Sequence, residues 1–238
     1  MVLALRVLGA TLQQVAAHFS AALVSNIVAF ILSAPLVLAI LVAAYLLRSF
    51  SVVPFGIMLL LGVLPNPAAA GLQYVVRESS TTMGIVALHD HLAGLRSLWL
   101  TALKTWSVSV LVTAVILLNL AFYSSTAGSR HSPLAPIAAP LDALLLVLLF
   151  AWLSLHLFVY PLLFQQEVPG IRLTYRNAFV MSAARPVFTC VATAIWLALL
   201  FLCSATGLTT IIGLALGAYF QHNAFTRLLP SLLTEEVR

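Results

Sequence analysis

Only a few side chains capable of acid-base chemistry lie inside the long apolar stretches of this chain. Asp142 and His156 are the two ionisable residues at such positions, where a charged group is costly and is therefore often functional. Asp142 follows Pro140 by two positions at the start of its stretch, so we favour a helix-capping role over an ion or proton site. His156 precedes Tyr160 by one helical turn, and we favour a hydrogen-bonded interior histidine.

Asp142 and His156 do not pair with each other within one helix. Fourteen positions at 1.5 Å rise separate them by about 21 Å. Asn119, in another apolar stretch, is expected to bond a neighbouring helix. Gly213 and Gly217 form a GxxxG pair that lets a neighbouring helix approach closely, and we interpret them as helix packing.

The remaining polar clusters do not support catalysis or metal binding. His89, Asp90 and His91 carry metal-ligand side chains, but positions two apart on a helix point to different faces, and no further His or Cys cluster supports them. No HExxH, GxSxG or GxxxxGK[ST] motif is present. We therefore expect no enzyme activity, no bound metal and no cofactor.

The composition indicates a membrane protein. Of 238 residues, 63% are hydrophobic and 7% are charged, against roughly a quarter charged in a typical soluble domain. The eleven Lys and Arg residues are scattered singly between apolar runs, so the net charge of +5 does not indicate a nucleic-acid partner. A helix of about 20 apolar residues crosses the bilayer core and satisfies its own backbone, so we expect an all-α transmembrane bundle.

The apolar stretches predict one membrane domain over 1–238 with six spans. A mixed apolar and polar N-terminus predicts an interfacial helix over 1–21, and polar amphipathic stretches predict two cytoplasmic loops with surface helices, 77–105 and 165–186. Small and hydroxyl residues at 204–207 predict the turn between the last two spans. The predicted spans are about 27–47, 52–76, 106–123, 137–164, 187–203 and 208–229.

The second predicted span admits two interpretations. Pro65 and Pro67 lie in its middle, and a residue that precedes proline is disfavoured in helical geometry. The segment is therefore either a broken span, giving six crossings, or a re-entrant segment, giving five. We prefer six crossings, because the apolar residues after Pro67 are long enough to continue through the bilayer.

The distribution of basic residues predicts the orientation. Nine of the eleven Lys and Arg residues fall on one side of the membrane in both topologies, which places the 77–105 loop, the 165–186 loop and the C-terminus in the cytoplasm. We expect the bacterial plasma membrane.

The order of several segments resembles the YesL family of bacterial integral membrane proteins. The resemblance extends from about Asn26 to Leu229 and includes LLLGVLPNPAAAGLQYVVRE and YPLLFQQEVPGIRLTYRNAFVMSAARP. The residues that carry it, together with a basic amphipathic stretch around Arg96 and Lys104, are Pro65, Pro67, Gly71, Tyr74, Tyr160, Pro161, Arg176, Asn177, Ala178 and Pro186.

This resemblance implies a function only by association, because the molecular activity of the family is unassigned and its genes often lie beside carbohydrate-uptake ABC transporters. We expect an accessory protein whose partners are the lipid bilayer and membrane transport proteins, contacted through the cytoplasmic loops. The alternative is a small transporter or channel, since a Pro-broken helix exposes backbone groups near the bilayer midplane.

Overall fold

The computed structural model describes residues 1–64, 66–78, 84–127, 135–166 and 170–233, and every regular element in them is a helix. The elements in chain order are α1 (Val2–Ala17), α2 (Phe19–Leu32), α3 (Ala34–Leu46), α4 (Val52–Ile57), the π-helix η1 (Met58–Val63), α5 (Pro67–Glu78), α6 (Gly84–Ala127), α7 (Ala135–Gln165), α8 (Ile171–Ala184), α9 (Pro186–Ala205), the 3-10 helix η2 (Leu208–Thr210) and α10 (Gly213–Leu233).

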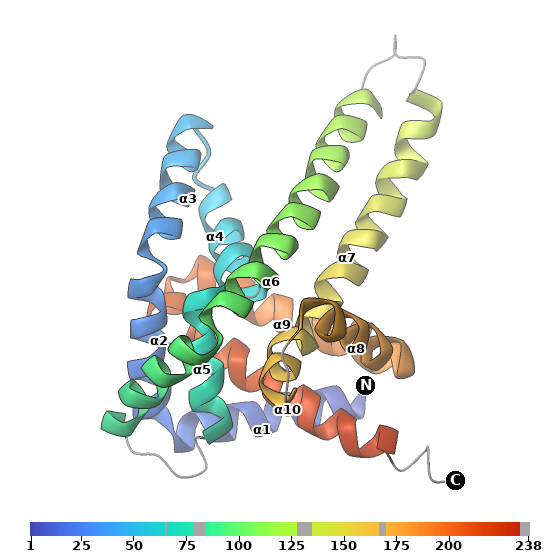
Figure 1. Cartoon of the computed structure of the whole chain (residues 1–238). Helices are drawn as coiled ribbons and strands as arrows, with labels where there is room; N and C mark the ends of the chain where they lie inside the picture. The colour runs from blue at the N-terminus through green and yellow to red at the C-terminus, as the bar shows by residue number, and fades with distance from the viewer. Residues whose placement is uncertain (65, 79–83, 128–134, 167–169, 234–238) are drawn as a thin grey trace.

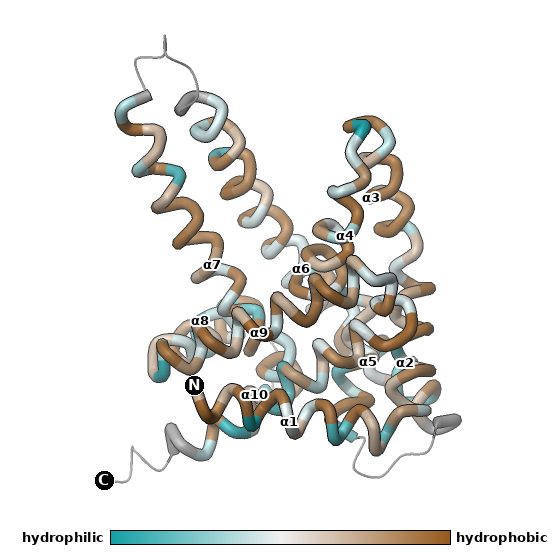
Figure 2. The backbone as a smooth tube through the Cα atoms, turned by 180° about the vertical axis from the view of Figure 1, so that it is seen from behind, coloured by the Kyte–Doolittle hydropathy of each residue, from teal (hydrophilic) through white to brown (hydrophobic). Residues whose placement is uncertain are grey.

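The helices form a base from which two hairpins project. Figure 1 shows α3 with α4 and α6 with α7 rising from the same side of the molecule, while α1 and α10 lie across its opposite end. In Figure 2 hydrophobic residues predominate along α3, α6 and α7, and hydrophilic ones gather around α1 and α10 and near the hairpin tips. An apolar zone between two polar ends is the distribution that a bilayer requires.

The structure supports fewer membrane spans than the six predicted. In the described residues three helices are long and apolar enough to cross a membrane: Ala87–Ser125, Pro136–Gln165 and Pro186–Ala205. The number rises to five if each of two bent pairs is one span, α1 with α2 (bent by 93°) and α4–η1 with α5 (bent by 56°). The chain thus has several apolar helices consistent with a membrane location, and six crossings are not confirmed.

The predicted 208–229 span corresponds to α10, which is not among these helices. Two further local features differ from the prediction. The predicted 27–47 span is interrupted at Ser33, because Pro35 cannot continue the helical hydrogen bonding, and α3 alone has only 13 residues. The predicted surface helix and the 106–123 span instead form one helix, α6, whose 44 residues extend about 66 Å at 1.5 Å rise per residue.

The last two helices are joined by a tight turn after Ala205. Gly207 adopts a left-handed conformation (φ 76°), which a residue without a Cβ enters without strain. α10 then packs against α9 through Gly213 and Gly217, whose added Cβ atoms would lie 2.9 Å from Cys203 Cβ and from Leu200 Cδ2, respectively.

The buried core lies where α1, η1, α7, α9 and α10 meet. Its largest fully buried side chains are Trp196, Phe158 and Phe220, and each is entirely removed from solvent. By contrast, the outer faces of the hairpins expose many large apolar residues, among them Leu38, Leu118 and Val147. So much exposed apolar surface is unfavourable in water, whereas contact with apolar lipid tails has no such cost.

Candidate functional site

Buried amide side chains join the interrupted helices. Asn26 of α2 is fully buried, and its Nδ2 donates to the carbonyl oxygens of Thr209 (2.8 Å) and Thr210 (3.1 Å). Its Oδ1 accepts from the backbone N–H of Ala215 in the first turn of α10 (2.9 Å). A single side chain thereby bonds three backbone groups around the η2–α10 turn.

Asn66 performs a similar role at the break before α5. Its Oδ1 accepts from the N–H of Ala68 (3.0 Å), which is N-terminal capping with Pro67 as the first helical residue. Its Nδ2 donates to Ser33 Oγ (2.8 Å) at the α2–α3 break, and its carbonyl oxygen accepts from the hydroxyl of Tyr160 in α7. The two ends of the α3–α4–η1 segment are therefore bonded to each other and to α7.

His156 is the centre of the most extended polar network. A carbonyl oxygen only accepts, so the contact of His156 Nδ1 with the oxygen of Trp152 (2.9 Å) requires a proton on Nδ1. In the neutral ring Nε2 is then an acceptor, and Ser109 Oγ of α6 lies 3.0 Å from it and 2.8 Å from the Thr105 oxygen, the two acceptors that its single proton can reach. Ser109 Oγ lies 2.5 Å from the hydroxyl of Tyr175 in α8, so the network connects three helices.

A second branch of this network reaches the base of the molecule. Gln221 of α10 donates from Nε2 to the carbonyl oxygen of His156 (2.8 Å), and its Oε1 accepts from Gln73 of α5 (2.5 Å). Asn223, two positions further along α10, donates to Thr11 (3.2 Å) and Gln14 (2.8 Å) of α1. α10 therefore carries the amides that hold α1, α5 and α7 together.

Tyr175 and Trp152 connect the network to the outer surface of α7. Their rings stack with centroids 5.3 Å apart and an interplanar angle of 15°, and Trp152 Nε1 donates to Thr113 (3.0 Å). Burial raises the pKa of Tyr175 to about 12, against the opposing effect of its bond with Ser109. The phenol therefore remains protonated and able to donate at neutral pH.

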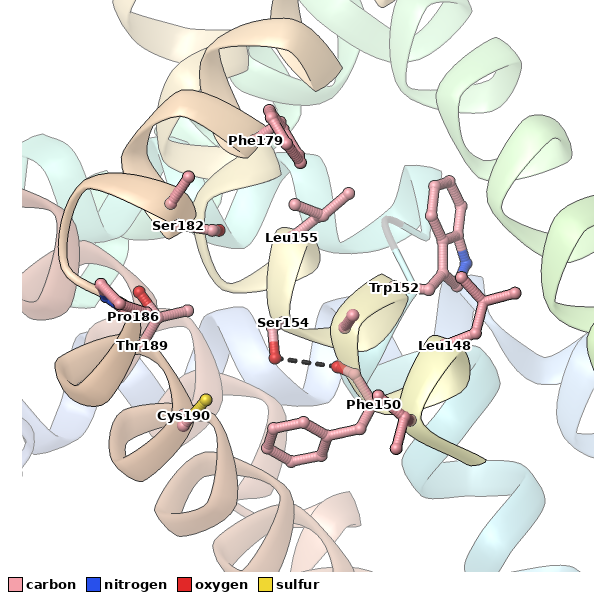
Figure 3. A pocket seen from close by; sticks show the side chains of 13 residues that line it. Leu148, Phe150, Trp152, Ser154, Leu155, Phe179, Ser182, Pro186, Thr189 and Cys190 are labelled. Atoms are coloured by element: carbon pink, nitrogen blue, oxygen red, sulfur yellow. Dashed lines mark hydrogen bonds between the residues drawn. The ribbon is translucent and has the colours of Figure 1, made fainter. Parts of the chain in front are cut away.

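A groove of about 440 Å³ lies on the other side of Trp152, between α7, α8 and α9. Figure 3 shows its walls, which are formed mainly by apolar side chains such as Phe150, Leu155 and Phe179. Ser154 does not offer its hydroxyl to the groove, because it donates to the Phe150 carbonyl oxygen of its own helix (2.8 Å). The groove can therefore hold an apolar molecule.

The other polar residues singled out from the sequence lie outside the His156 network. Asp142 is not a cap, because α7 begins at Ala135, and its Oδ2 accepts from Ser124 of α6 (2.9 Å). Asn119 does not bond a neighbouring helix: it is exposed and donates to Val115 in its own helix (2.8 Å). Pro65 lies outside the described residues, and the described part of the chain holds no group of three His, Cys, Asp or Glu residues that could bind a metal.

The residues that carry the family resemblance are distributed over several contacts. Gly71 of α5 lies against His91 of α6, and Tyr74 packs against Gly94 one turn further along. Pro161 lies inside α7, which continues through it. Arg176 is exposed on α8, Asn177 is half-buried beside it, and Pro186 is the first residue of α9 and borders the groove.

Sequence reasoning identified His156 but missed the buried amides Asn26, Asn66, Gln73, Gln221 and Asn223. The sequence contains a signal for these amides, since an amide within an apolar membrane helix is normally bonded to another helix.

No family model matches this chain, and no curated protein and no solved structure shows significant similarity to it.

Proposed function

We propose that this chain is a multi-pass accessory protein of the bacterial plasma membrane that docks on a membrane transport protein without catalysing a reaction. A component of carbohydrate uptake is the partner that the YesL resemblance implies. The observation that carries the proposal is the composition of the exposed face of α8. We place α8, the 77–105 region and the C-terminus on the cytoplasmic side, as the distribution of basic residues predicts.

The outer face of α8 combines charge with apolar surface. Arg172 and Arg176 stand one helical turn apart, and both are exposed, as are Phe179 and Val180. The opposite face is buried through Thr174, Ala178 and Met181. Arginine beside exposed aromatic and aliphatic residues is the composition that protein interfaces favour.

The polar interior supports docking over catalysis. His156, Ser109 and Gln221 bond to one another or to backbone groups, and the groove between α7, α8 and α9 has mainly apolar walls. Saturated networks of this kind rigidify a bundle and leave few groups for a substrate.

Replacing Arg172 and Arg176 together by alanine should reduce the recovery of a co-purifying membrane protein by about tenfold, the effect of losing roughly 1.4 kcal/mol of binding energy. The full chain would be cross-linked in native membranes, purified through an affinity tag, and its partners quantified by mass spectrometry. The matched control replaces Arg6 and Arg48, which are exposed on α1 and at the α3–α4 turn. Recovery of the chain alone, or equal recovery with both double variants, would contradict docking through α8.

A small transporter is the second candidate, favoured by the break between η1 and α5. π-helical turns and Pro-initiated half-helices are frequent at functional sites in membrane proteins, and Asn66 lies at this break. This alternative predicts flux of a sugar or ion into liposomes that contain the purified chain, and a loss of flux with Asn66→Ala. Absence of flux for a panel of sugars and monovalent ions would dismiss it.

A further inference from the structure

Two hydroxyl groups at one end of the groove between α7, α8 and α9 distinguish it from a plain apolar surface. Ser182 Oγ and Thr189 Oγ1 are buried, and neither has a hydrogen-bond partner within the described part of the chain. The Thr189 residue is only 3% exposed. A buried hydroxyl without a partner costs free energy, so an occupant that brings an acceptor would bind with a gain.

The position of the groove indicates what the rest of the occupant must be. α7 and α9 are two of the three helices long and apolar enough to span a membrane, so the groove faces hydrocarbon. Its walls are nearly all apolar, and Figure 3 shows aromatic rings of Phe150 and Phe179 beside the aliphatic side chains of Leu148 and Leu155. An acyl chain is the occupant that this environment supplies and that these walls accept.

The charge around the hydroxyl end points to an anionic headgroup. Arg185 is exposed at the bend between α8 and α9, directly before Pro186, which borders the groove. Arg172 and Arg176 add two further positive charges on α8, and neither α8 nor α9 contains an acidic residue. Basic residues beside membrane helices attract anionic lipids.

We propose that this groove binds one acyl chain of an anionic glycerophospholipid, with the ester carbonyls accepting hydrogen bonds from Ser182 and Thr189 and the phosphate lying near Arg185. The groove adjoins the outer face of α8, because Phe179 belongs to both. The two proposals are tested by different measurements, the protection of Cys190 by lipid and the recovery of a partner protein, so one can fail without the other.

Cys190 provides a direct reporter, because it lines the groove and is an exposed free thiol, whereas Cys203 is buried. The full chain would be delipidated in detergent and titrated with phosphatidylglycerol, and the rate of maleimide labelling at Cys190 would be measured. We expect a saturable slowing of at least about tenfold with one lipid bound per chain in native mass spectrometry. Phosphatidylcholine with the same acyl chains should require about tenfold more lipid, since it lacks the net negative charge.

Two variants test the groove itself. Ser182→Ala with Thr189→Val removes both donors at nearly constant volume and should raise the half-saturating phosphatidylglycerol concentration by roughly tenfold, the loss of two hydrogen bonds of modest net strength. Ala183→Phe should fill the groove and abolish protection, while Ala143→Phe, on an exposed face of α7 outside the groove, should leave it unchanged.

Three outcomes would overturn the proposal. These are the absence of saturable protection, equal protection by phosphatidylcholine, and protection by free fatty acid at the concentration that suffices for phosphatidylglycerol. If Ala183→Phe unfolds, as judged by a loss of helical content, the Ser182→Ala with Thr189→Val variant remains the test of the groove. Its side chains have nearly the same volume as those of the native residues, so it should keep the fold.

Discussion

Replacing Gly71 or Gly94 by alanine should destabilise this protein by at least about 2 kcal/mol for each substitution, at the upper end of what overpacking of a core costs. The two glycines lie where α5 crosses α6. A Cβ at Gly71 would stand 2.3 Å from the backbone oxygen of His91, and one at Gly94 would stand 2.4 Å from Tyr74 Cβ. Neither obstacle is the end of a flexible side chain, so the helices themselves would have to separate.

Reversible unfolding in mixed detergent micelles would measure this loss, with far-UV circular dichroism as the signal. The matched control is Gly9→Ala in α1, where a Cβ meets nothing within 4 Å. That substitution should leave stability unchanged or raise it by about 0.5–1 kcal/mol, because alanine is the better helix former.

The double variant sharpens this test. Gly94 is close enough to Gly71 that its added Cβ would lie 3.3 Å from the Gly71 Cα. One separation of the helices relieves both clashes, so the double substitution should cost clearly less than the sum of the single ones. If either alanine variant matches the wild-type stability, α5 and α6 do not cross as closely as they do here.

The helical class of this protein follows from its sequence for a simple reason. Apolar runs of about 20 residues leave the backbone no partner except itself, so helices are the only solution in lipid. The turn after Ala205 is equally local, because Gly207 supplies the left-handed conformation without help from the rest of the chain.

The number of spans was predicted less well, because it depends on tertiary contacts. α10 contains Gln221, His222 and Asn223, and the two amides bond α5, α7 and α1. Hydropathy treats these residues as a modest interruption of an apolar run, and it has no term for partners more than 60 positions away in sequence. The continuity of α6 through Thr105 and Trp106 was missed for the same reason. Hydropathy divides this region into a polar surface helix and an apolar span, whereas in the structure the two form one helix.

The candidate site shows the same limit. His156 stood out because it is ionisable and lies in an apolar run, and the structure gives its ring two hydrogen bonds. Asp142 and Asn119 stood out equally, yet Asp142 accepts from Ser124 and Asn119 donates to Val115 within its own helix, so neither belongs to the His156 network. Residue type and segment hydropathy are therefore insufficient to predict which polar residues join the interior network. The side of the helix on which a residue lies decides whether it reaches a partner on another helix.

Asn26 and Asn119 allow a test of whether the contacts of a polar residue, rather than its type, decide its contribution to stability. Asn26→Leu should lower the free energy of unfolding by about 2 kcal/mol or more, because it removes the partner of the buried Thr209 oxygen, of the Ala215 N–H and of the Thr210 oxygen. A single interhelical bond in a membrane averages roughly 0.6 kcal/mol, and Asn26 forms three with one side chain.

Asn119→Leu makes the same chemical change in another apolar helix, so it serves as the control. Its amide is exposed and bonds only the Val115 oxygen of its own helix, which keeps a backbone partner without it. The variant should be neutral or slightly stabilising, since leucine is a better helix former and suits a lipid-facing position. The same unfolding measurement applies to both variants. Equal costs at the two positions, or a larger cost for Asn119→Leu, would mean that the α2 to α10 contact through Asn26 does not hold this fold together.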